Sequence, residues 1–147
     1  MIPAALQEII DFFEPLPEAE RRENLIHYAE AAALQARKSG LIYDLEEVRK
    51  DQECSDTVGV FLYVDGEGCV QFAIELGPKI QTLTKALATI LCRGLNGSLP
   101  NEILAVSSDF VPRIVGADLV RLRSQTIYYL LGRMQTAVKT LMLQSCL

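Results

Sequence analysis

The sequence predicts an α+β fold, in which a small antiparallel sheet (a hairpin plus a possible third strand) packs against flanking helices. Two apolar runs that alternate with period two stand on either side of a glycine-rich turn, which is typical of a β-hairpin. Apolar residues recur with helical spacing near both ends of the chain. No internal repeat or linker-like segment divides the 147 residues, so we expect one domain over residues 1–147 with helices on one face of the sheet.

The predicted hairpin turn is 65–68, Asp-Gly-Glu-Gly, where glycine can adopt positive φ. We expect Val64 to pair with Cys69 across the hairpin. That register would place Cys54 near the level of Lys79, at the open end of the hairpin and beside the start of the next helix. Cys69 would then lie at the other end of the sheet, about 30–35 Å from Cys54 at the usual rise per residue.

Two amphipathic helices are expected before the hairpin. The first ends at Pro15, and the second begins near Pro17 and continues to a glycine cap at Gly40. Residues 41–50 form a connector in which a short third strand is possible. The predicted buried stripes of the two helices are Leu6, Ile9, Ile10 and Phe13, and Leu25, Ile26, Ala29, Ala32, Ala33 and Ala36.

Four helical segments are expected after the hairpin. One opens at Pro78 and ends over 94–97, short turns follow over 100–105 and 108–116, and a long helix covers about 119–143. The predicted stripes of the two long helices are Ile80, Leu83, Leu87, Ile90 and Leu91, and Ile127, Leu130, Leu131, Met134, Val138 and Leu141. Cys92, in the last turn of the helix after the hairpin, is expected to be a packed hydrophobe.

Composition and charge exclude several classes of protein. Half of the residues are hydrophobic, which argues against disorder, and a net charge of −5 argues against nonspecific nucleic-acid binding. No apolar run reaches membrane-spanning length, and the first residues lack the pattern of a signal peptide. The four cysteines form no Cys-x-x-Cys pair, which indicates reduced thiols, and a single histidine argues against a local zinc site.

Three segments, in this order, resemble the SufE family, the sulfur-acceptor proteins that work with cysteine desulfurases. They are LQEIIDFFEPLPEAERRENLIHYAEAA, PKIQTLTKALATILCRGLNGSLPNEIL and DFVPRIVGADLVRLRSQTIYYLLGRMQ. Cys54 falls on the acceptor cysteine of the family, ahead of the first long strand, and Val58 is at the matching strand position. Arg123 falls on the arginine of the family's Ser-Arg-x-x-Gly pattern. The resemblance covers nearly the whole chain and implies a SufE/IscU-like fold.

The sequence departs from the family pattern around the acceptor cysteine. Where the family usually has Val-x-Gly-Cys-x-Ser, this chain has Glu53 in place of the glycine and Asp56 in place of the serine. After Arg123, Gln125 and Thr126 stand where the family has asparagine and glycine. The resemblance of the fold is therefore stronger than that of the active loop, and function depends on the site.

The resemblance implies a sulfurtransferase-type accessory protein rather than a stand-alone enzyme. Cys54 would accept sulfur from a cysteine desulfurase, stimulate it, and pass the sulfur to an iron–sulfur scaffold protein. Pyridoxal phosphate would belong to the desulfurase, so no cofactor is expected here, nor is a nucleic-acid or membrane partner. We expect a cytoplasmic protein (stromal in a plastid if a transit peptide has been removed), as a monomer or homodimer. The expected partner-binding residues are Lys50, Glu53, Asp56 and Arg123.

Two alternatives stay open at this point: a SufE-like binding or regulatory module that no longer transfers sulfur, and an incidental loop cysteine at position 54. The thiolate is the nucleophile in sulfur transfer, so its pKa matters. The start of the following helix favours an anion, but the segment 49–56 holds two basic and three acidic residues. The sequence leaves open whether the pKa of Cys54 is raised or lowered.

Overall fold

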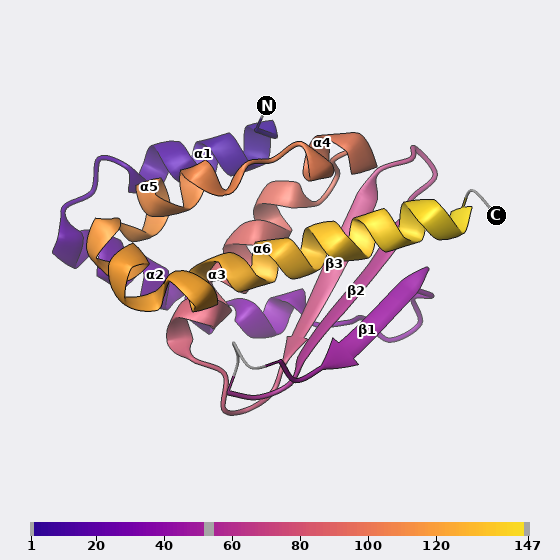
Figure 1. The fold of residues 1–147 in the computed structure, drawn as a ribbon, viewed down its shortest axis with the longest axis horizontal. Coiled ribbons are helices and arrows are strands. Elements are labelled where there is room, and N and C mark those ends of the chain that lie inside the picture. The colour runs from indigo at the N-terminus through magenta and orange to yellow at the C-terminus, as the bar shows by residue number, and fades with distance from the viewer. Residues whose placement is uncertain (1, 52–54, 146–147) are drawn as a thin grey trace.

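The computed structural model describes residues 2–51 and 55–145. Three antiparallel strands form one sheet in the order β1-β2-β3, and helices cover one of its faces (Figure 1). This confirms the predicted α+β fold. The strands are β1 (Leu45–Arg49), β2 (Val58–Val64) and β3 (Val70–Leu76). The helices are α1 (Ala4–Phe13), α2 (Glu18–Glu30), η1 (Ala32–Gln35), α3 (Thr82–Leu95), α4 (Pro100–Leu104), η2 (Ser108–Phe110), α5 (Val111–Val115) and α6 (Ala117–Ser145).

The hairpin of β2 and β3 forms as predicted, but the predicted register is wrong by one residue. Val64 pairs with Val70, and Cys69 belongs to the turn, where its carbonyl accepts the Asp65 N–H at 2.8 Å. A side-chain oxygen of Asp65 also accepts the Cys69 N–H at 3.0 Å, and Gly68 adopts a φ of 82°. These bonds close a tight loop with glycine near its end, a common kind of hairpin connection.

The two faces of the sheet have different environments. The inward face carries the apolar side chains of alternate positions, while on the other face the ring of Phe61 packs against Tyr43 and lies under the Arg37 guanidinium. The third strand that the sequence allowed is present as β1, which pairs with β2 from Leu45 opposite Leu62 to Arg49 opposite Val58. The inward residues of β2 and β3 are Val58, Val60, Leu62, Val70, Phe72 and Ile74. Val64, in the same alternating run of β2, is 39% exposed at the hairpin end.

The first helix before the sheet ends ahead of Pro15 as predicted, whereas the second is shorter than predicted. All four predicted stripe residues of α1 are buried, but α2 ends at Glu30 rather than at Gly40. The following alanines form η1, which contacts α3 and β3, so tertiary packing outweighs their helix propensity. Ile26, predicted to be buried, is 47% exposed. Gly40 has a φ of 87° in a turn instead of capping a helix.

Helix α3 begins at Thr82, four residues after the predicted start at Pro78. The delay has a local cause, because the Lys79 N–H is bonded to the Asp56 carboxylate and the Ile80 N–H to the Gly77 carbonyl. Most of α3 is buried between α1, the sheet and α6, and Cys92 is a fully buried hydrophobe as predicted. Burial raises the pKa of the Cys92 thiol to about 12.

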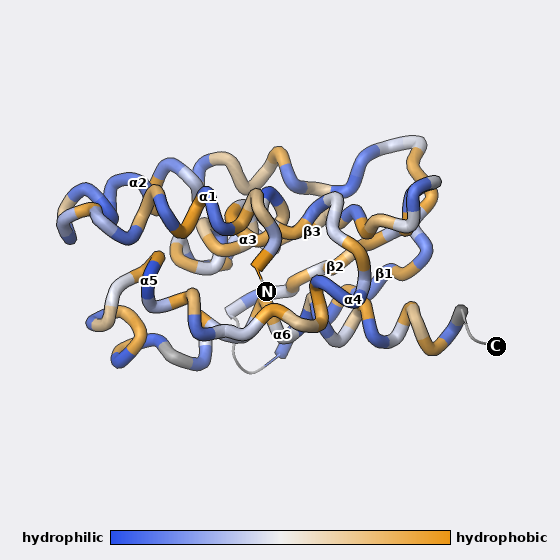
Figure 2. Tube along the Cα trace, turned by 90° about the horizontal axis from the view of Figure 1, so that it is seen from above, coloured by the Kyte–Doolittle hydropathy of each residue, from blue (hydrophilic) through white to orange (hydrophobic). Residues whose placement is uncertain are grey.

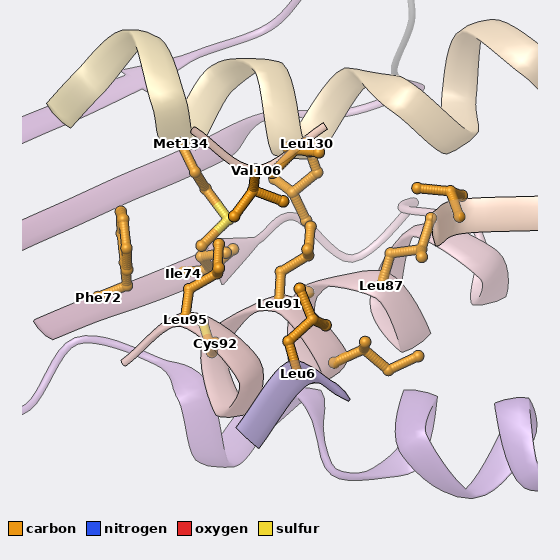
Figure 3. Packing of buried hydrophobic residues seen from close by; sticks show 14 of the residues in the cluster. Leu6, Phe72, Ile74, Leu87, Leu91, Cys92, Leu95, Val106, Leu130 and Met134 are labelled. Carbon is orange, nitrogen blue, oxygen red and sulfur yellow. The ribbon is translucent and has the colours of Figure 1, made fainter. Parts of the chain in front are cut away.

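The segments after α3 follow the prediction closely. Pro100–Leu104 is a short helix, η2 and α5 end at Gly116 with a φ of 90°, and all six predicted stripe residues of α6 are buried. Met134 and Leu130 point from α6 toward Leu91 and Leu95 of α3 (Figure 3). Apolar positions concentrate along β2 and α3, whereas α2 is mostly hydrophilic (Figure 2). Among the described residues, no helix has the length and hydropathy needed to cross a bilayer.

Gly94 sets how closely α1 approaches α3. A Cβ atom at this position would lie 2.8 Å from Leu6 Cδ1 and 3.1 Å from Leu6 Cα, so the backbone of α1 blocks any side chain. We expect Gly94→Ala to destabilise the protein by about 1–3 kcal/mol through overpacking, although alanine is the better helix former. The free energy of unfolding in urea measures this change.

Gly132→Ala is the matched control for this prediction. Gly132 also lies within a helix, α6, but a Cβ atom there meets nothing within 4 Å. The control should therefore be stabilising by about 0.5–1 kcal/mol. Equal effects of the two substitutions would contradict the close-approach argument for Gly94.

Candidate functional site

The candidate site is the connection between β1 and β2, residues 50–57, which carries Cys54. Cys54 itself and the expected partner-binding residue Glu53 lie outside the described residues. The residues on either side, Asp51 and Ser55, are described, and each is bonded to a different part of the fold. These two flanks make up the described part of the site.

The flank after Cys54 is bonded to the segment between β3 and α3. The Ser55 hydroxyl donates to the Lys79 carbonyl at 2.6 Å, and the Asp56 carboxylate accepts the Lys79 N–H at 2.9 Å. Asp56 also accepts the N–H of Thr57 at 2.8 Å. The bond from Lys79, and then that from Thr57, hold the pKa of Asp56 below its usual range. Ser55 thus lies at the level of Lys79, as the observed hairpin register requires, while the predicted level of Cys54 falls outside the described residues.

Gly77 makes room for the Asp56 carboxylate. A Cβ atom on Gly77 would lie 2.3 Å from Asp56 Cγ and from one carboxylate oxygen, so any side chain there would displace the carboxylate. The Gly77 N–H in turn donates to the Thr57 carbonyl at 3.0 Å. Asp56, which stands in place of the family's serine, thus joins this flank to the segment between β3 and α3.

The flank before Cys54 is bonded to α6. The Asp51 carboxylate accepts the Arg49 Nε–H at 2.9 Å and the hydroxyl of Tyr129 at 2.5 Å. The bond from Tyr129, followed by that from Arg49, holds the pKa of Asp51 below its usual range. Arg49, Asp51 and Tyr129 lie at an open depression of the surface, so this flank is accessible.

Arg133, on the same helix, is 4% exposed and completes this flank. Its guanidinium donates to the carbonyls of Glu47 on β1 and Val58 on β2, at 3.0 and 3.2 Å, and to the Tyr129 hydroxyl at 2.6 Å. It also pairs with the Glu47 carboxylate at 3.2 Å. The sequence reasoning missed Arg133 and Tyr129. The available signal was an arginine next to Met134 within the apolar stripe of α6, where a buried charge needs several partners.

Arg123 lies near the other flank. The helix α6 is interrupted at Arg123, whose φ of −136° and ψ of 33° are not helical. Its guanidinium donates to the Gln81 side chain at 3.1 Å, just after the segment that binds Ser55 and Asp56. The charge of Lys50 acts on Asp56 and also lowers its pKa. The structure thus brings Lys50, Asp56 and Arg123 to the same end of the sheet.

Cys69 and Cys92, the cysteines in the described part of the chain, lack the environment of a reactive thiol. Desolvation, with Asp65 as the next cause, raises the pKa of Cys69, and burial raises that of Cys92. A nucleophilic thiol benefits from a lowered pKa instead. Over residues 2–51 and 55–145, no group of three or more His, Cys, Asp or Glu residues is arranged to hold a metal ion.

Both the sequence and the fold of this chain are similar to those of known proteins. The family model of SufE, described as the Fe-S metabolism associated domain, matches residues 7–138. The chain therefore belongs to the SufE family, whose domains work with cysteine desulfurases in Fe–S metabolism. A solution structure of a hypothetical protein from Thermus thermophilus is similar to it, with 27% identity, a TM-score of 0.72 and coverage of 97% of this chain and 98% of that one. No curated protein matches the sequence.

The internal role of Asp56 can be tested through pH. Because its pKa is lowered in the folded state, its stabilising contribution is present above the unfolded-state pKa and is lost as the pH falls through the folded-state pKa. Asp56→Asn should therefore lower the free energy of unfolding at pH 7, since its amide NH₂ would face a backbone N–H. The difference from the wild type should shrink below pH 3.8, the ordinary aspartate pKa.

Glu23→Gln, which neutralises an exposed carboxylate on α2, is the control for charge removal alone. Urea unfolding of the three proteins, from pH 7 to below pH 3.8, measures the effect. A constant difference between Asp56→Asn and the wild type at every pH would mean that the carboxylate charge is not what stabilises the flank.

Proposed function

We propose that this protein accepts sulfane sulfur on Cys54 from a cysteine desulfurase, stimulates that enzyme, and passes the sulfur to an iron–sulfur scaffold protein. The observation that carries the proposal is the place of Cys54 in a SufE-family chain. It stands between two flanks, Asp51 and Ser55, that are each bonded to another element. Such restraint of the flanks favours reaction with a partner, because it reduces the conformational freedom lost on docking.

The transfer step balances without an added oxidant or reductant. The Cys54 thiol first loses its proton, and the thiolate attacks the terminal sulfur of the desulfurase persulfide, Cys–S–SH. A sulfur–sulfur bond forms on Cys54 as the sulfur–sulfur bond of the desulfurase breaks, and the desulfurase cysteine leaves as a thiolate. Cys54 then carries the persulfide until a second thiol attacks its terminal sulfur in the same way.

The charges around the flanks favour a nucleophilic thiol more than the count of two basic and three acidic residues over 49–56 suggests. Asp51 is paired with Arg49 at 2.9 Å and lies 3.8 Å from the Arg133 guanidinium, so its charge is largely compensated. The Asp56 carboxylate accepts two backbone N–H groups. Of the three acidic residues in the segment 49–56, two thus have local partners that offset their repulsion of a thiolate.

The proposed partner surface surrounds these flanks and consists of Lys50, Glu53, Asp56 and Arg123. Lys50 and Arg123 are exposed cations of a chain whose net charge is −5, so they are suited to carboxylates of a desulfurase. The cytoplasmic or stromal location and the monomeric or homodimeric state stay predictions.

A second candidate function is a SufE-like regulatory module that binds a desulfurase without accepting sulfur. The observation in its favour is the altered acceptor loop, with Glu53 in place of the family glycine and Asp56 in place of the serine. Glutamate lacks the backbone freedom of glycine, and its charge lies directly beside Cys54 in the chain. The two functions differ in whether the protein itself gains sulfur.

The first test of the proposed function is the intact mass after incubation with a desulfurase and cysteine. The wild type should gain one or more sulfur atoms on Cys54 and stimulate the desulfurase, whereas Cys54→Ser should do neither. Cys69→Ser, which changes a thiol of raised pKa at the other end of the hairpin, is the matched control and should behave as the wild type. Sulfur that maps mainly to Cys69, Cys92 or Cys146 would defeat the proposal, and binding without any gain of mass would favour the regulatory module.

The partner surface is tested by binding to the desulfurase at increasing salt. Lys50→Glu and Arg123→Ala should each weaken binding, by about 3- to 30-fold if the cations meet carboxylates in a partly desolvated interface. Rising ionic strength should weaken the wild-type complex through screening. Arg22→Ala removes an exposed arginine of α2, paired with Glu18, and should leave binding unchanged. If affinity is indifferent to salt and to both substitutions, the interface lies elsewhere.

A further inference from the structure

The hydrogen bonds that converge on Arg133 join α6 to the connection that carries Cys54. We name this set the Arg133 network, and it consists of Glu47, Asp51, Val58, Tyr129 and Arg133. We propose that Tyr129 and Arg133 are positioning residues for sulfur acceptance, which hold Asp51 and thereby the chain that leads to Cys54. The inference rests on the proposed function, but the restraint itself can be tested without it.

The guanidinium of Arg133 bonds to both strands that flank the connection. It donates to the Glu47 carbonyl in the middle of β1 and to the Val58 carbonyl, where the chain enters β2. These two strands are paired neighbours, with Arg49 opposite Val58. One planar group from α6 therefore bonds to both of the strands between which the connection runs.

Tyr129 extends this restraint along the connection. Its hydroxyl accepts a hydrogen bond from Arg133 at 2.6 Å and donates one to Asp51 at 2.5 Å. Tyr129 and Arg133 are four residues apart on α6 and lie on the same side of the helix. The buried guanidinium orients the hydroxyl, and the hydroxyl holds a carboxylate three residues before Cys54.

The bonds within the network are of the strong kind. Arg133 and Asp51, which bond to the Tyr129 hydroxyl from either side, are both charged. Hydrogen bonds to charged groups are shorter and stronger than neutral ones. The Arg133 side chain is only 3% exposed, so water competes little for the inner bonds, whereas Asp51 at the outer end is 25% exposed. The network thus carries rigidity from the buried face of α6 to the surface where a partner would dock.

Positioning matters for this chemistry because attack on a persulfide sulfur requires alignment with the sulfur–sulfur bond. Small displacements of reacting groups can slow a reaction by about a hundredfold. The second flank is already held by Ser55 and Asp56 through Lys79. Loss of the Tyr129 hydroxyl would leave Asp51 bonded to Arg49 of β1, with the Arg133 guanidinium at 3.8 Å as its remaining ion pair with α6.

The test is Tyr129→Phe, which removes only the hydroxyl. Tyr128→Phe, at the neighbouring half-buried tyrosine of the same helix, is the matched control. Transfer of sulfur from a desulfurase to Cys54 is followed by intact mass at several concentrations of the protein. We expect the maximal rate of Tyr129→Phe to fall about tenfold, with the concentration giving half-maximal rate unchanged, because alignment and not docking is lost.

Two further measurements separate positioning from other causes. Alkylation of Cys54 by iodoacetamide needs no alignment with a partner, so its rate should stay within about twofold of the wild type from about pH 6 to 9. Amide hydrogen exchange in a peptide covering residues 50–57 should be faster in Tyr129→Phe and unchanged in Tyr128→Phe. Unfolding curves of both variants establish that they are folded at the assay temperature.

An unchanged maximal rate of transfer in Tyr129→Phe would overturn the inference. So would a fall matched by an equal loss of alkylation, which indicates lower thiol reactivity, or by a higher half-maximal concentration, which indicates lost docking. If the wild type gains no sulfur, the proposed function fails and hydrogen exchange decides the restraint. Faster exchange over 50–57 in Tyr129→Phe then supports the restraint, and unchanged exchange overturns it.

Discussion

The arrangement of the candidate site depends on one buried arginine. Arg133 is almost completely removed from water, and burying a guanidinium is costly unless its donors are satisfied. The backbone carbonyls of Glu47 and Val58, the Glu47 carboxylate and the Tyr129 hydroxyl satisfy it. Because the energetic cost of burial is met only when β1, β2 and α6 are all in place, Arg133 couples the long helix to the sheet edge that carries the site.

The second flank uses a different device, a close approach that only glycine allows. The Asp56 carboxylate sits against Gly77 and takes the Lys79 N–H, which also delays the start of α3 to Thr82. In a helix that began at Pro78, the Lys79 N–H would lie in the first turn and would have no partner within the helix. The Asp56 carboxylate accepts this N–H instead. Asp56 departs from the family pattern, and its carboxylate holds one flank of the acceptor loop.

Sequence reasoning succeeded where one local pattern decides the structure. Apolar residues follow the period of their element in α1, in the two strands β2 and β3, and in α6. Nearly all of them are buried, and Val64 at the hairpin end is an exception. It failed where two local signals competed. The alanine-rich segment after Glu30 favours helix, yet it turns into η1 against α3 and β3, and the hairpin register depended on whether Cys69 belonged to the strand or the turn.

The sequence by itself determined the family, the α+β class and the choice of Cys54 as the candidate sulfur acceptor. Hydrophobic periodicity, turn residues and the order of motifs are all properties of the chain. Only the tertiary structure decided how Asp51, Ser55 and Asp56 are held. Their partners, Tyr129 on α6 and Lys79 before α3, are 78, 24 and 23 residues away along the chain. The bonds to Lys79 depend on the register of the hairpin, which was predicted one residue out. No local pattern encodes the bond between Asp51 and Tyr129, since it exists only after α6 has packed on the sheet.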